Sequence, residues 1–200
     1  MTGAAEQPPG AGDPQLMIGV AIAVPEPYAE HLQRKRESFG DPMAPHIPAH
    51  VTLLPPTPIA AAALGEVREH LAAVCAAGHP FDMRLRGTDT FRPVSPVVFV
   101  RVDEGEDDCR RVEAGVRSGV LQRTLAFDYH PHVTVAHDLP DPSLDEASRS
   151  LADFEAVFPV EAVTLYRHNG DGRWRVEDEY PLGGGHDPED QRAKGDQGRA

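Results

Sequence analysis

The segments PAHVTLL at residues 48–54 and PHVTVA at residues 131–136 decide the fold, because each resembles the other. Both have a proline shortly before His-Val-Thr and an apolar continuation after it. With 10 histidines in a chain of 200 residues, His-Val-Thr would occur twice by chance in about one of a thousand sequences. A helix opened by proline is predicted shortly after each copy. We therefore infer two structurally related lobes, each with one His-x-Thr strand.

Side chains alternate between the two faces of a β-strand, so the histidine and threonine of each copy share a face. One imidazole and one hydroxyl, two residues apart, can transfer a proton and hydrogen-bond an oxyanion at the same time. A single His-x-Thr strand is more often structural, whereas the matched pair favours function. The candidate site residues are His50, Thr52, His132 and Thr134.

Helices and strands are predicted to alternate around these two motifs. The longest helix is expected over residues 58–77, with Thr57 as its cap, Pro58 in its first turn and Gly78 at its end. Other apolar periodicities predict helices near residues 27–39, 106–120 and 142–154. Strands are expected at residues 16–24, 81–86 and 97–102, and a hairpin from 163–166 to 174–176 through Asn169-Gly170-Asp171-Gly172.

This pattern predicts an α+β fold with two lobes, each an antiparallel-rich sheet flanked by helices, and a central cleft between the two His-x-Thr strands. Residues 16–182 are expected to form this single domain. Residues 1–15 and 183–200 are expected to be disordered tails, because they contain too few apolar side chains to offset the entropy of ordering.

The composition restricts the partners and the compartment. A formal net charge of −13 opposes an extended groove for nucleic acid, so a phosphate must be held locally. No apolar run is long enough for a membrane span, and no basic residue precedes the apolar segment 16–24, as a secretory signal would require. Cys75 and Cys109 are expected to be buried free thiols. We expect a cytoplasmic monomer.

The two motifs, with their proline and apolar flanks, resemble those of the 2H phosphoesterase superfamily, which includes the RNA cyclic phosphodiesterases historically called 2′-5′ RNA ligases. The resemblance extends over residues 16–182 and implies a bilobal, pseudo-two-fold fold with the site in the cleft. It also implies cleavage, without a metal or other cofactor, of a 2′,3′-cyclic phosphate or a 2′-5′ linkage. The substrate would be an RNA terminus or a small cyclic nucleotide. The resemblance favours His50 as the acid and His132 as the base.

The residues support the same chemistry, because two histidines can act as base and acid on opposite sides of a phosphorus atom. Two alternatives stay open: a non-catalytic module that binds phosphate ligands or RNA ends, and a metal-dependent hydrolase using His130, His132 and His137. On a strand, His130 and His132 would share one face and His137 would lie on the other, so no metal site is predicted. Further candidates for substrate binding are Tyr129, Phe91 and Arg92.

Overall fold

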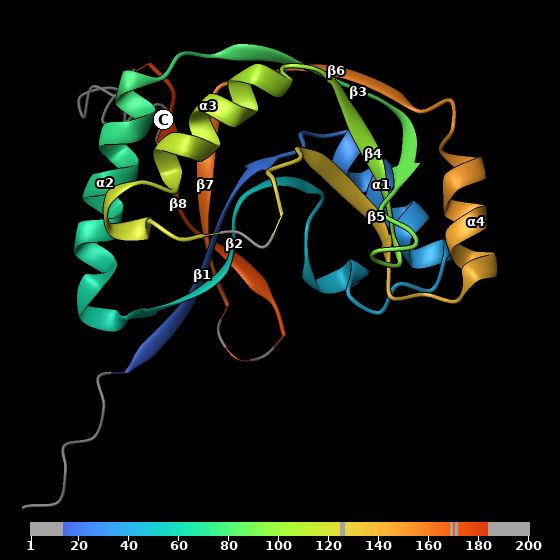
Figure 1. Cartoon of the computed structure of the whole chain (residues 1–200), viewed down its shortest axis with the longest axis horizontal. Coiled ribbons are helices and arrows are strands. Elements are labelled where there is room, and N and C mark those ends of the chain that lie inside the picture. The colour runs from blue at the N-terminus through green and yellow to red at the C-terminus, as the bar shows by residue number, and fades with distance from the viewer. Residues whose placement is uncertain (1–13, 125–126, 169, 171, 184–200) are drawn as a thin grey trace, which may run out of the picture.

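The computed structural model describes residues 14–124, 127–168, 170 and 172–183. Helices are interspersed among the strands in this part of the chain (Figure 1). In chain order the elements are β1 (Gln15–Ala23), α1 (Tyr28–Ser38), η1 (Ala44–His46), β2 (His50–Ala60), η2 (Ala61–Ala63), α2 (Leu64–Ala77), β3 (Phe81–Thr90), β4 (Val97–Glu104), α3 (Glu106–Val116), η3 (Gly119–Leu121), β5 (His132–His137), α4 (Asp141–Ser150), β6 (Glu155–Val160), β7 (Ala162–His168) and β8 (Trp174–Pro181), where η denotes a 3₁₀-helix.

The structured region is slightly longer than the predicted domain. Gln15 already belongs to β1, and the Gly183 N–H donates a hydrogen bond to the Cys75 carbonyl. The rest of the two expected tails, residues 1–13 and 184–200, lies outside the described residues, as do Asn169 and Asp171 of the predicted hairpin turn. The hairpin itself is confirmed, because β7 and β8 pair in antiparallel fashion.

The prediction of two sheets is wrong, because the strands form one continuous antiparallel sheet. Its order is β6-β3-β4-β5-β2-β1-β7-β8. The two central strands are those that carry the His-x-Thr motifs, and they pair through Val51 and Val133. This pairing joins two four-stranded halves, so the predicted lobes are the halves of a single sheet.

Each half contains the same succession of strand, helix, 3₁₀-helix and motif-bearing strand: β1-α1-η1-β2 in one and β4-α3-η3-β5 in the other. The first helix of each unit packs against the motif strand of the other unit, α1 against β5 and α3 against β2 (Figure 1). The halves are therefore interlocked around the β2–β5 junction. None of the helices in the described ranges is long and apolar enough to cross a membrane.

The predicted start of the longest helix is wrong by six residues. Thr57 and Pro58 belong to β2, where they pair with Ile18 and Met17 of β1, and the helix begins at Leu64 after a 3₁₀ turn. Beyond Val51, β2 has no partner on its other side in the described sheet. Prolines are tolerated on an open strand edge because no ladder hydrogen bond is lost there. The predicted end at Gly78 is confirmed.

The core lies between the sheet and the helices, and both cysteines belong to it. Cys75 and Cys109 are free and buried, as predicted. Burial raises the pKa of Cys75 to about 11. Burial, reinforced by Asp108 and Glu106, raises the pKa of Cys109 to about 12. Both side chains therefore remain protonated near neutral pH and behave as small apolar groups.

Candidate active site

The four candidate residues lie together at the junction of β2 and β5. Val51 and Val133 are opposite each other and fully buried, whereas the residues on either side of each valine are half-buried and project from the other face. In an antiparallel pair, this register places each histidine across from the threonine of the other strand. The four residues on this shared face are His50, Thr52, His132 and Thr134.

Each of the two histidine rings is held by the same kind of hydrogen bond, from Nδ1 to a backbone carbonyl two residues earlier. His50 Nδ1 lies 2.7 Å from the Pro48 carbonyl oxygen, and His132 Nδ1 lies 2.7 Å from the His130 carbonyl oxygen. A carbonyl oxygen can only accept, so Nδ1 carries the proton in each ring. Nε2 is therefore the atom of each neutral imidazole that can accept a proton from a ligand.

The surroundings favour the neutral form of both rings. Burial lowers the pKa of His50, and the charge on Arg36 lowers it further. Burial likewise lowers the pKa of His132, and His130 and His50 add to the effect. In each case the hydrogen bond from Nδ1 to the carbonyl acts in the opposite direction but is the smaller influence. A phosphate between the rings would stabilise the imidazolium form and offset part of this lowering.

These pKa values predict a dependence of stability on pH. The unfolded chain binds protons at His50 and His132 near pH 6.5, whereas the folded chain binds them only at lower pH. Their contribution to stability is complete above about pH 6.5 and is lost as the pH falls through the folded pKa values. Urea unfolding measured between pH 8 and pH 5 should show that the free energy of unfolding falls more steeply with decreasing pH in the wild type than in the H50N/H132N double variant. Equal slopes would contradict the lowered pKa values.

Two cavities meet at His50. One, of about 170 Å³, lies beside His50 and Thr52 and has Tyr166 and Trp174 in its wall. The other, of about 320 Å³, lies between His50 and Thr134 and extends to Arg36 and Asp41. Each cavity therefore reaches the threonine of a different half of the sheet. A ligand group at His50 has space on two sides.

Of the three further candidates, Phe91 lies against the site. Its ring meets His132 edge-on, with centroids 5.0 Å apart and planes at 88°. Phe99, which is opposite Thr134 in the β4–β5 ladder, packs on the same imidazole at 5.0 Å. The two phenyl rings therefore supply the apolar surroundings of His132 and limit the orientations of its ring.

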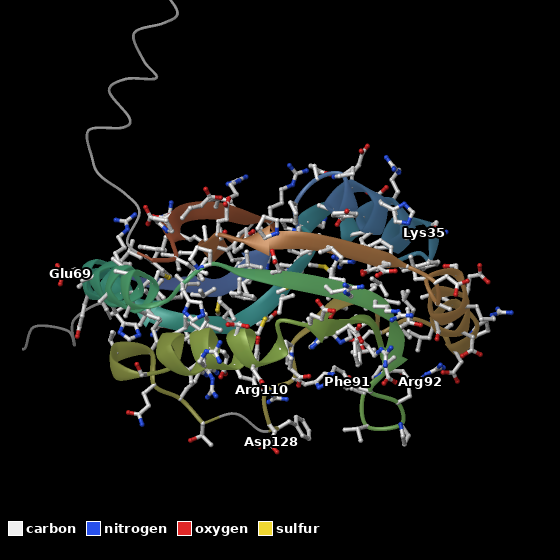
Figure 2. The ribbon with its side chains drawn as sticks, turned by 90° about the horizontal axis from the view of Figure 1, so that it is seen from above. Lys35, Glu69, Phe91, Arg92, Arg110 and Asp128 are labelled. Carbon is white, nitrogen blue, oxygen red and sulfur yellow. The ribbon has the colours of Figure 1, made fainter. Side chains whose placement is uncertain are left out.

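Tyr129 and Arg92 make contacts with the core and with α4. The Tyr129 ring is partly buried and packs on the core, and burial raises the pKa of its hydroxyl. Arg92 forms ion pairs with Asp141 and Asp145 at the start of α4. Figure 2 shows Arg92 next to Phe91, at the edge of the molecule. Its guanidinium is thus occupied by carboxylates.

The histidines considered as metal ligands do not converge. His130 and His132 are neighbours with centroids 6.2 Å apart, whereas His137 is exposed and its Nε2 lies 3.4 Å from Asp138. Within the described residues, no group of three or more His, Cys, Asp or Glu side chains is arranged to hold a metal ion.

Sequence reasoning missed Trp174, Tyr166 and Arg36. The sequence pattern places Tyr166 and Trp174 in the predicted hairpin, and in the structure both also line the smaller cavity. Gly19 could have indicated that a side chain packs closely on β1, because glycine within a strand often marks a close approach. A Cβ at this position would lie only 3.2 Å from the Trp174 ring. Arg36 follows buried Leu32 by four residues in α1, so a charge on the apolar face of that helix was visible in the sequence.

The duplicated strand-helix-strand unit, with one His-x-Thr strand in each copy, defines a class of two-histidine α+β proteins. The sequence profile described as the 2′-5′ RNA ligase superfamily matches residues 24–172. The chain belongs to this superfamily, which is the 2H phosphoesterase group that the paired motifs resemble.

Curated relatives are similar over most of the chain, and solved structures share its fold. A protein of Halalkalibacterium halodurans named "Putative phosphoesterase" is 26% identical over 173 residues, which are 84% of this chain and 98% of that protein. TT0787 of Thermus thermophilus superposes with a TM-score of 0.60 at 22% identity, covering 85% of this chain and 100% of its own. LigT of E. coli complexed with 3′-AMP gives a TM-score of 0.56 at 19% identity, and the match covers 84% of this chain and 99% of the LigT chain.

Proposed function

We propose that this protein is a metal-independent phosphodiesterase that hydrolyses a 2′,3′-cyclic phosphate or a 2′-5′ phosphodiester at an RNA end or in a small nucleotide. The observation that carries the proposal is the matched pair of Nδ1 hydrogen bonds, 2.7 Å each, on two adjacent motif strands. Two imidazoles held in the same way through Nδ1, so that Nε2 of each is the atom that exchanges a proton with a ligand, are what a reaction needs when it requires a base and an acid together.

In this mechanism one histidine takes a proton from water as the water oxygen bonds to phosphorus. The bond from phosphorus to the ribose oxygen breaks on the opposite side, and the other histidine gives its proton to that oxygen. His50 is assigned as the acid and His132 as the base. Thr52 and Thr134 donate hydrogen bonds to the non-bridging oxygens as their negative charge increases. Protons and electrons balance without a further reactant.

The smaller cavity supports a nucleoside as part of the substrate. Its wall includes Tyr166, Trp174, Leu54 and Pro56, and it opens beside His50. An indole and apolar side chains suit a nucleobase, which stacks on aromatic rings regardless of its identity. The structural relative LigT has been crystallised with 3′-AMP, the kind of molecule that results when a cyclic phosphate is opened.

The experiment that tests the function is a product screen. Purified protein is incubated with 2′,3′-cyclic nucleotides, RNA ending in a cyclic phosphate and 2′-5′ dinucleotides, and the products are separated by chromatography. We expect turnover of at least one class. Binding of these ligands with no product in any reaction would instead identify a non-catalytic binding module.

The same assay predicts that activity is retained in a large excess of chelator. The proposed mechanism assigns the stabilisation of the non-bridging phosphoryl oxygens to the two threonines and the proton transfers to the two histidines, so it requires no Lewis acid. Turnover with EDTA should equal turnover without it. If chelation abolishes the activity and one particular metal ion restores it, the metal-dependent hydrolase is the correct alternative.

A further inference from the structure

We propose that Arg36 and Arg110 are positioning residues, one for each site histidine. Each holds the backbone carbonyl that directly precedes the carbonyl to which the imidazole is hydrogen-bonded. The inference rests on the proposed function for its effect on turnover, whereas its effect on the histidine rings can be measured without a substrate. Neither arginine touches a motif side chain through a hydrogen bond; each acts through the loop that precedes its motif strand.

The first arrangement begins in α1. Arg36 Nη1 donates a hydrogen bond of 2.9 Å to the Ile47 carbonyl. The next carbonyl in the chain, that of Pro48, accepts the Nδ1 proton of His50. Asp41 accepts from Arg36 Nε and Nη2 at 3.1 and 2.9 Å, and both side chains of this pair are almost fully buried. The guanidinium is thus fixed on two sides, between a carboxylate and the loop.

The second arrangement begins in α3. Arg110 Nη1 donates a hydrogen bond of 2.7 Å to the Tyr129 carbonyl, and the next carbonyl, that of His130, accepts the Nδ1 proton of His132. Glu106, one helical turn earlier, forms an ion pair with Arg110. Figure 2 shows Arg110 reaching from α3 toward the segment at Asp128. Here too the guanidinium joins a carboxylate to the loop before a motif strand.

The two arrangements match in register. Each arginine binds the carbonyl three residues before a histidine, and the histidine binds the carbonyl two residues before itself. The loop sequences differ, IPAH in one and YHPH in the other, so the likeness does not come from a shared local sequence. Because a peptide unit is planar, fixing one carbonyl leaves only two backbone dihedrals to set the direction of the next. Both arginines therefore restrict the acceptor that selects the histidine tautomer.

The two arginines differ in one respect that is useful for a test. Arg36 is buried, and its charge is one of the influences that lower the pKa of His50, after burial itself. The Arg110 side chain is 44% exposed, and its charge is not among the causes that lower the pKa of His132. Replacing Arg110 therefore removes the hydrogen bond to the loop with little change in burial.

The experiment compares R110A with R111A. Arg111 is the next residue of the same helix and also forms an ion pair with an acidic residue of α3, Asp108, but its hydrogen bond goes to Asp108 and not to the loop before β5. In R110A we expect the His132 imidazole to show mixed tautomers in ¹⁵N-edited NMR and to lose its protected Nδ1–H signal. We also expect kcat to fall about 10-fold to 100-fold, with KM changed less than threefold, which is the loss expected from misplacing a catalytic group by about 1 Å. R111A should match the wild type in both readouts.

The R36K variant provides the second part of the experiment. Lysine keeps the charge near His50, but it lacks the planar guanidinium that binds Asp41 and the Ile47 carbonyl at the same time. We expect mixed tautomers at His50 and an unchanged His132. An R110A protein whose His132 keeps a single tautomer and full kcat would overturn the proposal. If the wild type cleaves no substrate, the proposed function fails, but the NMR comparison still decides whether the arginines orient the rings.

Discussion

Replacing either His50 or His132 with alanine is expected to lower kcat/KM by about 10²-fold to 10⁴-fold, the usual contribution of one positioned proton-transfer group. Each ring is fixed by a single Nδ1 hydrogen bond to a nearby carbonyl, and neither belongs to the buried core. The substitutions should therefore leave the fold intact. Initial rates with the best substrate from the product screen, together with circular dichroism of each variant, provide the measurement.

The double variant H50A/H132A should lose less than the product of the two single losses, because groups that act together in one step are not additive. H79A is a matched control, since the side chain of His79 is 67% exposed and lies against Asp108 in another part of the molecule. It should behave as the wild type. Near-normal turnover by both single variants, with the fold retained, would rule out the two-histidine mechanism.

The largest expected effect on stability is that of D41A. The Arg36 and Asp41 side chains are only 5% and 2% exposed, and removing the carboxylate leaves a buried guanidinium without its charge partner. Breaking a buried pair in this way costs about 3 to 5 kcal/mol of unfolding free energy. Asp41 also accepts a hydrogen bond from the Met43 N–H, so the turn before η1 is weakened as well. Urea denaturation at pH 7.5 measures the change.

Two comparisons distinguish this explanation from a general effect of losing an acidic residue. D145A removes an exposed partner of Arg92 and should change the stability far less. The double variant R36M/D41A removes both charges, and should recover part of the loss because no unpaired charge remains buried. If D41A were as stable as D145A, the buried pair would not support the loop as described.

Much of the fold could be predicted because its signals are local. The apolar positions Val67, Leu71 and Cys75 follow helical spacing and are buried in α2, and Phe81, Met83 and Leu85 alternate as a half-buried strand does. Strand β6 was not predicted. Its six residues, Glu155–Val160, include Pro159, which argues against a strand unless it lies at the edge of a sheet, as β6 does.

What could not be predicted depends on contacts between distant segments. The motif residues His50 and His132 were found because the same three residues recur, but the joining of two half-sheets by one pair of valines leaves no local signal. The roles of Tyr129 and Arg92 depended on α3 and α4, which pack beside them. The Nδ1 acceptors likewise required the loop geometry, because any nearby carbonyl could have served.

The most direct test of the two-histidine mechanism is the pH dependence of kcat/KM for the wild type and for the variants H50A and H132A. A base that must be neutral and an acid that must be protonated give a bell-shaped profile. The two-histidine mechanism predicts a bell for the wild type, with the acidic limb missing in H132A and the basic limb missing in H50A. If both limbs persist in both variants, the groups that titrate are not these histidines and the central claim is contradicted.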